Sequence, residues 1–493
     1  MASLSLATLD ALPAAVARPA ATARPDVGIV HLGLGAFHRA HQVEFTDDAL
    51  LASPGRWGIA GVSLKTPGAR DRLAGQDALY TLVQKRPGGV ERRVLGSLRE
   101  ALFLGDQRRR VVELLASAHT RIVSLTITEK GYGHDPATGK LDPAHPEIAS
   151  DLAGGAEPTS AIGLIVDALR LRRGSHGTPF SVLSCDNLPH NGAVARDLVL
   201  EFAQRRDPAL AQWIAGHVTF PSTMVDRIVP ATTDADIADN DAALGLHDAA
   251  PVVCEPFRQW VIEDAFAAGR PAWEAGGAEL VDDVAPFEAM KLRLLNGSHS
   301  ALAYLGYLAG HAFIYEVAGD ERFERYMRAL MQEATPTLRV PARVDLSAYR
   351  EALVTRFRNP ALPHRTRQIA MDGSQKLPQR LLAPMRENLA AGRPIEHEAL
   401  AVAAWMRYVS GRDERGGTID VADPLAARFA QAAAAHPDDP EAYARALLHI
   451  EAIFGTDLRD DARFTVPVID SLRALFRDGA ARSVDRLDTA HRA

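Results

Sequence analysis

The chain has 493 residues, of which 47% are hydrophobic and 24% are charged, a composition typical of a globular protein with two or three domains. Its formal net charge of −7 lacks the basic balance that binding to nucleic acid or to an anionic membrane needs, so we expect neither partner. The two cysteines, Cys185 and Cys254, are too few for a disulfide framework or a zinc site, so we expect no metal and a reducing, cytoplasmic setting.

Residues 1–25 are mildly apolar but lack the basic leading segment of a signal peptide, and we interpret them as a surface arm. Residues 27–32 (VGIVHL) have the β-branched, apolar character of a buried parallel strand. A helical stretch at 40–51 follows after the turn Gly33-Leu34-Gly35-Ala36-Phe37-His38-Arg39. Strand, glycine turn and helix in this order predict a dinucleotide site, although His38 replaces the third glycine of the fingerprint.

A second strand at 57–64 is followed by Lys65 and Thr66, with Arg70 just beyond. An NAD site of this kind usually has an acidic residue here, which binds the ribose hydroxyls. Basic groups would suit the 2′-phosphate of NADP, so these residues leave the choice between NAD and NADP open. The role of Arg39 is also left open: it could bind phosphate oxygens or form a surface ion pair.

Three further strands are predicted at 121–128, 179–185 and 218–229, with helices between them at 161–173 and 193–205. Alternating strands and helices predict an α/β domain with a doubly wound parallel sheet, which binds ligands beyond the carboxyl ends of its strands. Polar clusters lie at the ends of these strands: Thr128-Glu129-Lys130, Asp186-Asn187 and Val225-Asp226-Arg227. We expect the clusters to lie at the ligand-binding edge of the sheet.

The stretch from 285 to 310 combines a helical apolar pattern with three polar residues, Lys291, Asn296 and His299. On an α-helix, Asn296 would lie roughly 140° and His299 roughly 80° around the axis from Lys291, so all three could face one cleft. Partial burial would lower the pKa of the lysine toward that of a general base, and Asn296 could donate to a developing alkoxide. The alternative is a solvated lysine, a capping asparagine and a core histidine.

From residue 287 onward the pattern is almost wholly helical, with long segments at 321–333, 346–357, 379–391, 396–408 and 439–454. We place the domain boundary near 284–286, which gives a Rossmann-type domain at 1–284 and a mainly α-helical domain at 285–493. Lys376 and Arg380 are four residues apart, so on a helix they would share a face that either holds an anion or is simply solvated.

Eight segments resemble the mannitol dehydrogenase family, the polyol-specific long-chain dehydrogenases, over nearly the full length of the chain. They are HLGLGAFHRAHQ, SLTITEKGY, SCDNLPHNG, FPSTMVDRIVP, CEPFRQWVIED, MKLRLLNGSHSALAYLGYL, RFRNP and DGSQKLP. The resemblance implies a Rossmann-type domain followed by a mainly helical domain, and an oxidoreductase that uses NAD and no metal.

The resemblance also implies roles for individual residues. Lys291 would be the general acid/base, Asn187 and Asn296 would form the oxyanion site, and His299 would position the substrate. Glu288, one turn before Lys291, would be a proton route to solvent. The implied dinucleotide contacts are Gly33, Leu34, Gly35, Ala36, Phe37, His38, Arg39, Val225 and Asp226.

At two places the sequence differs from the pattern of mannitol 2-dehydrogenases. In both places it resembles the D-mannonate oxidoreductase (fructuronate reductase) branch of the family. A TEGGY-type turn is TEKGY here, which introduces Lys130, and Gln368 replaces an arginine eight residues before the lysine of DGSQK. Together with Lys376 and Arg380, these residues are the expected substrate contacts, and the added cations suit the carboxylate of a hexuronate. Mannitol or another neutral polyol, and tagaturonate or altronate, are the alternative substrates.

Two other classes of protein compete with this interpretation. A non-catalytic dinucleotide or sugar-acid sensor would keep the fold but would not need the set Asn187, Lys291, Asn296 and His299. A decarboxylating dehydrogenase would need metal-binding carboxylates, and the sequence shows no such cluster. We therefore expect a small-molecule sugar acid or polyol as the partner, and a monomer or weak oligomer.

Overall fold

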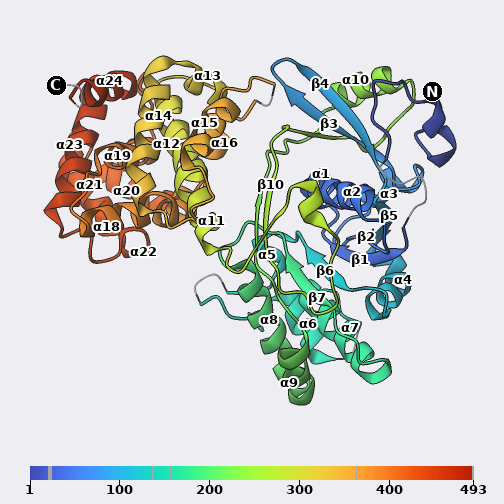
Figure 1. Cartoon of the computed structure of the whole chain (residues 1–493). Helices are drawn as coiled ribbons and strands as arrows, with labels where there is room; N and C mark the ends of the chain where they lie inside the picture. The colour runs from blue at the N-terminus through green and yellow to red at the C-terminus, as the bar shows by residue number, and fades with distance from the viewer. Residues whose placement is uncertain (20–24, 136–137, 155–156, 362, 491–493) are drawn as a thin grey trace. The chain divides into compact units, whose positions relative to one another are not determined.

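The computed structural model describes residues 1–19, 25–135, 138–154, 157–361 and 363–490. The chain folds into two compact units, Met1–Ala285 and Pro286–Ala493. The N-terminal unit contains the β-sheets, whereas the C-terminal unit is built almost entirely of helices (Figure 1). In the described part of the chain, no helix combines the length and the apolar character that crossing a membrane requires.

The N-terminal unit is organised around a five-stranded sheet in the order β5-β2-β1-β6-β7, in which every neighbouring pair is parallel. Its strands are β1 (Val27–Leu32), β2 (Gly58–Ser63), β5 (Leu98–Phe103), β6 (Ile122–Leu125) and β7 (Ser181–Ser184). The direction of winding reverses at β1, so β1 and β6 flank the point where open α/β sheets bind ligands. The predicted doubly wound parallel sheet is confirmed.

Helices cover both faces of this sheet because its central strands are apolar on both sides. Val30 of β1 packs in a core with α4 (Leu104–Ala116), α7 (Ala161–Ser175) and α8 (Asn191–Arg206). The preceding residue, Ile29, packs in a second core with α1 (Ala36–Ala40) and α2 (Gln42–Ala52). Figure 1 shows these two groups of helices on opposite sides of the sheet. The other helices of the unit are η1 (Leu6–Ala11), α3 (Gly68–Ala74), α5 (Thr128–Gly131), α6 (Pro146–Ala153), α9 (Pro208–His217), α10 (Asp234–Leu244) and η2 (Trp273–Gly276).

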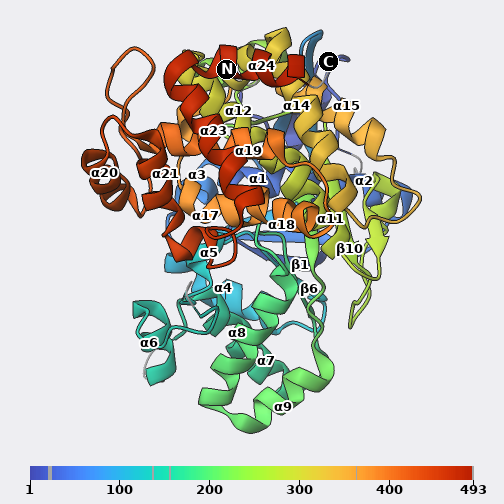
Figure 2. The same ribbon diagram turned by 90° about the vertical axis from the view of Figure 1, so that its left-hand side faces the viewer.

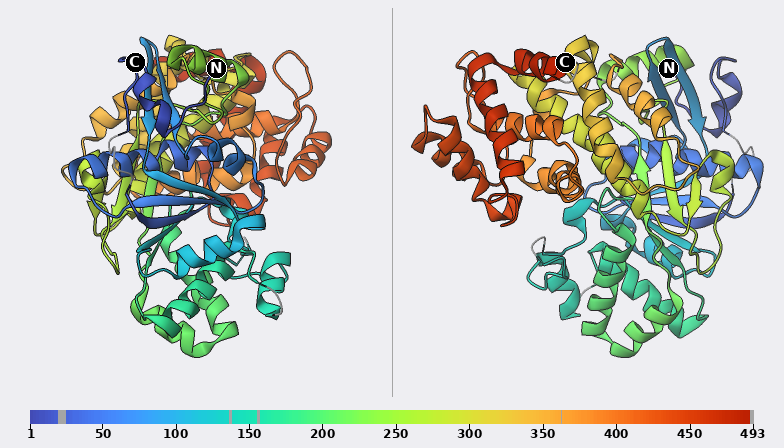
Figure 3. Two further views of the ribbon diagram at one scale, coloured as in Figure 1. Left: turned by 90° about the vertical axis from the view of Figure 1, so that its right-hand side faces the viewer. Right: turned by 60° about the vertical axis from the view of Figure 1, so that its left-hand side comes forward.

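Two three-stranded sheets complete the unit, in the orders β4-β3-β9 and β11-β10-β8. Their strands are β3 (Tyr80–Arg86), β4 (Gly89–Leu95), β8 (Thr223–Asp226), β9 (Val252–Cys254), β10 (Gln259–Glu263) and β11 (Glu279–Val281). The antiparallel β3–β4 hairpin is the long blue ribbon in Figure 1 and in the right-hand view of Figure 3. Of all these strands, only β8 falls within a segment predicted from the sequence.

The prediction that the strand at 218–229 joins the parallel sheet is wrong. Thr219 makes one parallel bridge to Ser181 of β7, but Pro221, which has no N–H to donate, follows two residues later. β8 then pairs antiparallel with β10, with Val225 opposite Trp260. The apolar pattern of this segment indicates that it is buried but carries no information about its pairing partner.

The N-terminal arm is packed against the rest of its unit. Leu4, Leu12 and Val16 are buried in a small apolar cluster that also contains Leu79 and Val94. This packing explains why a mildly apolar segment belongs to the folded unit. Residues 20–24 of the predicted arm lie outside the described residues, whereas residue 25 is described.

The C-terminal unit packs its helices around α12 (Gly297–Leu308) and the almost wholly buried α19 (Glu396–Val409). Figure 2 shows α19 and α23 (Ala462–Asp478), which pack against each other. The segments predicted at 321–333, 346–357 and 396–408 are helical, whereas those at 379–391 and 439–454 are each divided in two. The remaining helices are α11 (Ala285–Met290), η3 (Lys291–Asn296), α13 (Ile314–Gly319), α14 (Glu321–Ala334), η4 (Thr335–Thr337), α15 (Leu346–Phe357), α16 (Thr366–Ile369), α17 (Gly373–Leu377), η5 (Pro378–Leu382), α18 (Ala383–Ala390), α20 (Ala426–Ala435), α21 (Pro440–Leu448), α22 (Glu451–Phe454) and α24 (Ala480–Ala490).

Candidate active site

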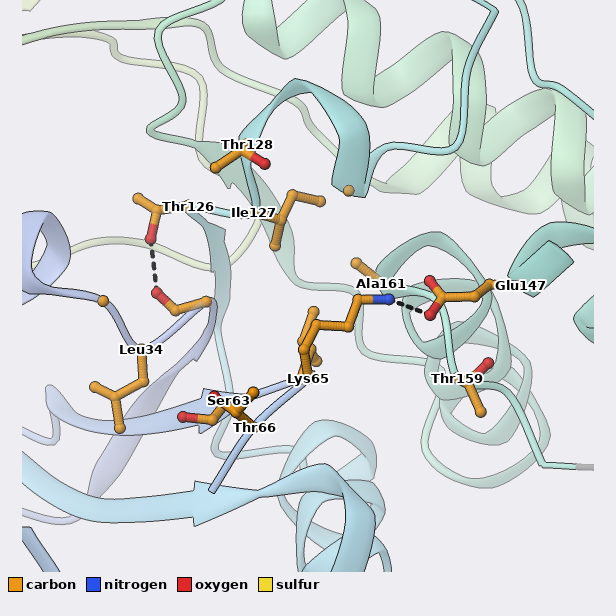
Figure 4. Close-up of a pocket in the computed structure, with 14 residues that line it drawn as sticks. Leu34, Ser63, Lys65, Thr66, Thr126, Ile127, Thr128, Glu147, Thr159 and Ala161 are labelled. Atoms are coloured by element: carbon orange, nitrogen blue, oxygen red, sulfur yellow. Dashed lines mark hydrogen bonds and ion pairs between the residues drawn. The ribbon is translucent and has the colours of Figure 1, made fainter. Parts of the chain in front are cut away.

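A pocket of about 260 Å³ lies at the carboxyl ends of β1, β2 and β6. Its walls are the loops that follow these strands, at 33–35, 63–66 and 126–128, together with Gly131, Glu147, Thr159 and Ala161 (Figure 4). This is the position beyond the strand ends where a doubly wound sheet binds its ligand. No sequence motif marked the last three of these residues, so their part in the pocket could not be predicted.

The glycine turn after β1 has a backbone that other residues could not adopt without strain. Gly33 has a φ of 106°, and a Cβ at this position would lie 2.0 Å from the carbonyl oxygen of Thr126. The Thr126 hydroxyl also donates to the Gly33 carbonyl at 2.8 Å (Figure 4). At Gly35, in contrast, a Cβ would meet only the Gly33 carbonyl oxygen, at 3.8 Å, so the backbone there is open to an approaching ligand.

His38 occupies the third glycine position, which normally allows the helix to pack closely on the strand. Its ring lies flat on the ring of His31 in β1, with centroids 3.4 Å apart and planes within 7° of parallel. Burial lowers the pKa of His31 to about 3 and the pKa of His38 well below its usual range, so both rings are neutral near pH 7. The helix and the strand therefore meet through a stacked pair of neutral imidazoles, where the usual fingerprint has a glycine.

Arg39 is directed into the protein interior. Its guanidinium donates to the carbonyl oxygen of Ala250 at 2.6 Å and lies over the ring of Tyr80. Of the residues predicted to contact a dinucleotide in this turn, the pocket lining includes Gly33, Leu34 and Gly35, and it does not include Ala36, Phe37, His38 and Arg39.

The basic residues beyond β2 are neutralised by carboxylates. Arg70 is held by Asp106 through two hydrogen bonds of 3.1 and 2.9 Å and by Asp71 through a third of 2.6 Å. Lys65 lines the pocket, and its ammonium group is ion-paired with Glu147 of α6 (Figure 4). The cations that suggested a site for a 2′-phosphate are therefore already engaged.

The turn after β6 is held by a carboxylate from the loop that follows the neighbouring strand, β7. Asp186 accepts hydrogen bonds from the backbone amides of Ile127 and Thr128, at 3.0 and 2.9 Å, and from the Tyr132 hydroxyl at 2.9 Å. Thr128 has a φ of 63°, a conformation that β-branched residues rarely adopt. Burial raises the pKa of Asp186, and these three donors oppose that shift. Asp186 thus stabilises a strained turn at the edge of the pocket.

Four other predicted site residues of the N-terminal unit lie outside the pocket lining. Asn187 directly follows Asp186 and is exposed, as is Lys130 in α5. Val225 and Asp226 are buried in β8. The roles of these four residues stay predictions.

In the C-terminal unit, Lys291 begins a π-helix, η3, that lies between α11 and α12. Hydrogen bonds in a π-helix join residues five positions apart, so residues at this spacing lie about one turn above each other. Lys291 and Asn296 are such a pair, and both are buried. The angle predicted between them assumed α-helical geometry, whereas this segment has π-helical hydrogen bonding, which places the two positions closer together around the axis. Glu288, also buried, precedes Lys291 by three residues.

Two buried polar atoms after Lys291, Nδ2 of Asn296 and Nε2 of His299, have no hydrogen-bond partner among the described residues. The His299 ring lies beside those of Phe357 and His364, with centroid distances of 5.2 and 5.7 Å. A buried polar group without a partner costs about 1–3 kcal/mol, so these atoms suit a polar ligand that satisfies them.

The surroundings of His299 are positively charged. Burial lowers its pKa well below the usual range, and His364, Arg380, Arg356 and Lys376 lower it further. The imidazole is therefore neutral near pH 7, and it can donate or accept a hydrogen bond without adding to this charge.

Arg380 lies in a second π-helix, η5, which packs against η3. The approach is close because Gly297 has no side chain: a Cβ there would lie 3.0 Å from the carbonyl oxygen of Arg380. The Arg380 guanidinium donates to the Ser300 hydroxyl at 3.0 Å, and burial lowers its pKa. Among the described residues it has no carboxylate partner, so this desolvated cation is available to an anion.

Lys376 precedes Arg380 by four residues, and its ammonium group donates to the backbone carbonyls of Ile369 and Met371. Burial, and then the neighbouring charge of Arg380, lowers its pKa to about 8. Gln368 is exposed in α16. The structure therefore brings Lys376 and Arg380 together with His299 and places Gln368 at the surface.

Neither metal nor thiol chemistry is indicated by the residues that the structure describes. Within that part of the chain, no three His, Cys, Asp or Glu side chains form a group that could hold a metal ion. Cys185 and Cys254 are both buried, and burial raises the pKa of the Cys254 thiol to about 12. A buried thiol of this kind is inert.

Comparison with known proteins covers both units of the chain. Residues 27–275 match the mannitol dehydrogenase Rossmann domain, and residues 283–476 match the mannitol dehydrogenase C-terminal domain. The chain belongs to the mannitol dehydrogenase family. It is an oxidoreductase of this family, as the resemblance of its motifs implies.

Several known proteins are similar to the chain over most of its length. D-mannonate oxidoreductase of Escherichia coli K12 is 48% identical and covers 96% of this chain and 98% of its own. The uncharacterized oxidoreductase YeiQ of the same organism is also 48% identical, over 92% of this chain and 93% of its own. The solved structure of Pseudomonas fluorescens mannitol 2-dehydrogenase with NAD and D-mannitol is 41% identical, covers 99% of both chains and has a TM-score of 0.85.

The glycine turn that lines the pocket in the N-terminal unit suits the backbone approach of a dinucleotide. Gly33 lets the turn approach β6, and Gly35 presents bare backbone to the cavity. The loops after β1 and β2 would hold the pyrophosphate and the adenosine ribose, which are the parts that such loops bind in Rossmann-type domains. The lining of this pocket is thus compatible with the dinucleotide that the family resemblance implies.

Proposed function

We propose that this enzyme interconverts D-mannonate and D-fructuronate with NAD as the redox cofactor. The observation that carries the proposal is the unneutralised charge of Arg380, which lies in the positive surroundings of His299. A sugar acid brings a carboxylate to such a site, whereas mannitol does not. The 48% identity to D-mannonate oxidoreductase supports the same substrate.

The chain's own residues would supply the proton transfers and the orientation, while bound NAD would accept or return the hydride. In oxidation, the substrate hydroxyl would lose its proton to the neutral amine of Lys291, and in reduction the protonated lysine would return it. Asn296 would donate from Nδ2 to the oxygen as negative charge develops on it. Asn187 keeps its proposed role as the second amide donor, His299 would position a hydroxyl, and Glu288 would connect Lys291 to solvent.

We propose NAD over NADP because Arg70 and Lys65 are both engaged by carboxylates. The mannitol 2-dehydrogenase of similar structure was solved with NAD, which supports the same choice. Catalytic efficiency with each cofactor, measured by absorbance at the nicotinamide band, tests it. A preference for NADP of more than tenfold would contradict the proposal.

Replacing Arg380 tests the substrate. Arg380→Met should lower kcat/KM for D-mannonate at least about tenfold, because a charge-assisted contact to a carboxylate is worth about 1.5–3 kcal/mol. Residual oxidation of D-mannitol should change much less, because mannitol has no carboxylate for this arginine to bind. Both rates are measured at saturating NAD, with D-altronate as a third substrate.

The matched control is Arg367→Met, which removes an exposed arginine of α16 that is ion-paired with Asp420. It should leave the ratio of mannonate to mannitol oxidation unchanged. If Arg380→Met weakens both substrates equally, or if the wild type prefers D-mannitol, the carboxylate assignment fails and mannitol 2-dehydrogenase becomes the better description.

The pKa of Lys376 predicts a pH dependence of substrate binding. Since this pKa is lowered to about 8, the ammonium group is charged below pH 8 and neutral above it. The Kd of D-mannonate, measured by calorimetry, should therefore rise as pH increases through 8. Lys376→Met should bind more weakly and show a smaller rise, whereas Lys376→Arg should retain affinity up to pH 9. An unaltered pH profile in Lys376→Met would remove this lysine from carboxylate binding.

A further inference from the structure

The position after β2 carries the discriminating carboxylate in NAD-binding Rossmann domains, but this chain has Lys65 and Thr66 there. The pocket nevertheless contains a carboxylate at this corner. It belongs to Glu147 in the first turn of α6, 82 residues further along the chain, and both Lys65 and Glu147 line the cavity. In Figure 4 the two side chains extend toward each other across the pocket wall.

The geometry of the pair determines what it can offer a ligand. The Lys65 ammonium donates to Oε1 of Glu147, so the second carboxylate oxygen keeps its capacity to accept hydrogen bonds. The Glu147 side chain is 30% exposed and that of Lys65 is 59% exposed, so both can be reached from the cavity. A ribose with free 2′- and 3′-hydroxyls offers donors to such an oxygen, whereas a 2′-phosphate offers only negative charge.

We propose that Glu147 is the residue that selects NAD over NADP, with Lys65 acting as a positioning residue that holds the carboxylate at the ribose. The lysine after β2 would then not favour NADP, because its charge is already neutralised by the group that repels the 2′-phosphate. This inference rests on the proposed NAD-dependent function and adds to it the residue that sets the cofactor preference.

The test is equilibrium binding of NAD and NADP to the full-length enzyme, measured by isothermal titration calorimetry, so that it does not depend on turnover. Glu147→Gln removes the carboxylate charge and releases the Lys65 ammonium. The ratio of the Kd for NADP to the Kd for NAD should fall by about tenfold or more, which is the scale of one charge interaction near a protein surface. Lys65→Met should not lower this ratio, because it leaves the carboxylate in place.

The matched control is Glu100→Gln, which breaks the ion pair with Arg110 outside the pocket. Its side chain is 29% exposed, nearly the same as that of Glu147, so the substitution removes a carboxylate of similar exposure from a different place. It should leave the binding ratio within twofold of the wild-type value.

A measurement on the unmodified enzyme gives a second test. Discrimination between 5′-ADP and 2′,5′-ADP should shrink as the salt concentration rises, because salt screens the repulsion between exposed charges. A Glu147→Gln ratio equal to that of Glu100→Gln, or discrimination that does not respond to salt, would overturn the assignment of Glu147 and leave the proposed function intact. If the wild type binds neither NAD nor NADP, the proposed function itself fails.

Discussion

Lys291→Ala should lower turnover by about 10²-fold or more, the usual scale for the loss of an acid–base group, while the Kd for NAD stays nearly unchanged. The reason is positional: Lys291 is buried at the start of η3, about one helical turn before Asn296, whose amide Nδ2 is unpartnered among the described residues. Without the amine, no group at this position can take the proton of the substrate hydroxyl.

The measurement for Lys291 is single-turnover hydride transfer at saturating NAD and D-mannonate, which separates chemistry from product release. Added methylamine should restore part of the rate in Lys291→Ala, because a small amine can occupy the space of the lost side chain and accept the proton. The control is Lys85→Ala, which removes a lysine that forms an ion pair with Asp236 in the N-terminal unit. Unchanged turnover in Lys291→Ala would exclude this lysine from the mechanism.

Gly33→Ala should destabilise the N-terminal unit by about 2–5 kcal/mol, one of the largest effects expected of any single methyl group. The φ of 106° disfavours a side chain, and the new Cβ would lie 2.0 Å from the carbonyl oxygen of Thr126. The new Cβ is fixed to the backbone of the turn and meets a backbone oxygen, so no side-chain rotation can remove the clash. The turn after β1 and the end of β6 would have to move apart. Thermal unfolding followed by circular dichroism should show a midpoint lower by about 5–15 °C, and NAD binding should fall as well.

Gly35→Ala is the matched comparison, because it adds the same methyl group to the pocket lining without straining the backbone. A Cβ at Gly35 meets only the Gly33 carbonyl oxygen, at 3.8 Å, and the φ of −100° is available to any residue. The unfolding midpoint should therefore stay within about 2 °C of the wild type. The Kd for NAD should still rise, because the methyl group occupies space beside the backbone that lines the pocket. A Gly33→Ala protein as stable as Gly35→Ala would contradict this account of the turn.

The sequence predicts those parts of the fold in which a local pattern has one physical outcome. Residues 27–32 form a buried central strand because a short, largely apolar run with β-branched residues has few alternatives. Residues 346–357 form a helix at the predicted positions. The start of this helix is fixed locally, because the Asp345 side chain accepts hydrogen bonds from the first free backbone amides. Gly33 and Gly35 line a pocket because strand, turn and helix place them at the edge of the sheet.

The parts that could not be predicted depend on partners that are distant in the sequence. Arg39 is bonded to a carbonyl group 211 residues away, so no local pattern could show that it faces the interior. Lys65 meets Glu147 across 82 residues, and neither residue lies in a motif that would indicate the pairing. The local geometry at Lys291 was missed for a different reason: a helical apolar pattern does not distinguish α-helical from π-helical turns.

The π-helix at Lys291–Asn296 contains one residue more than an α-helix with the same number of hydrogen bonds would need. Deleting one residue between the two positions would allow the hydrogen bonds to close with α-helical spacing, and the lysine and the asparagine would then be four residues apart. Residues at that spacing share a face of an α-helix, so such a deletion would keep the pair about one turn apart. When homologous sequences are compared, a one-residue gap at this point is therefore a smaller departure than the replacement of either side chain. Percentage identity does not distinguish these two kinds of change.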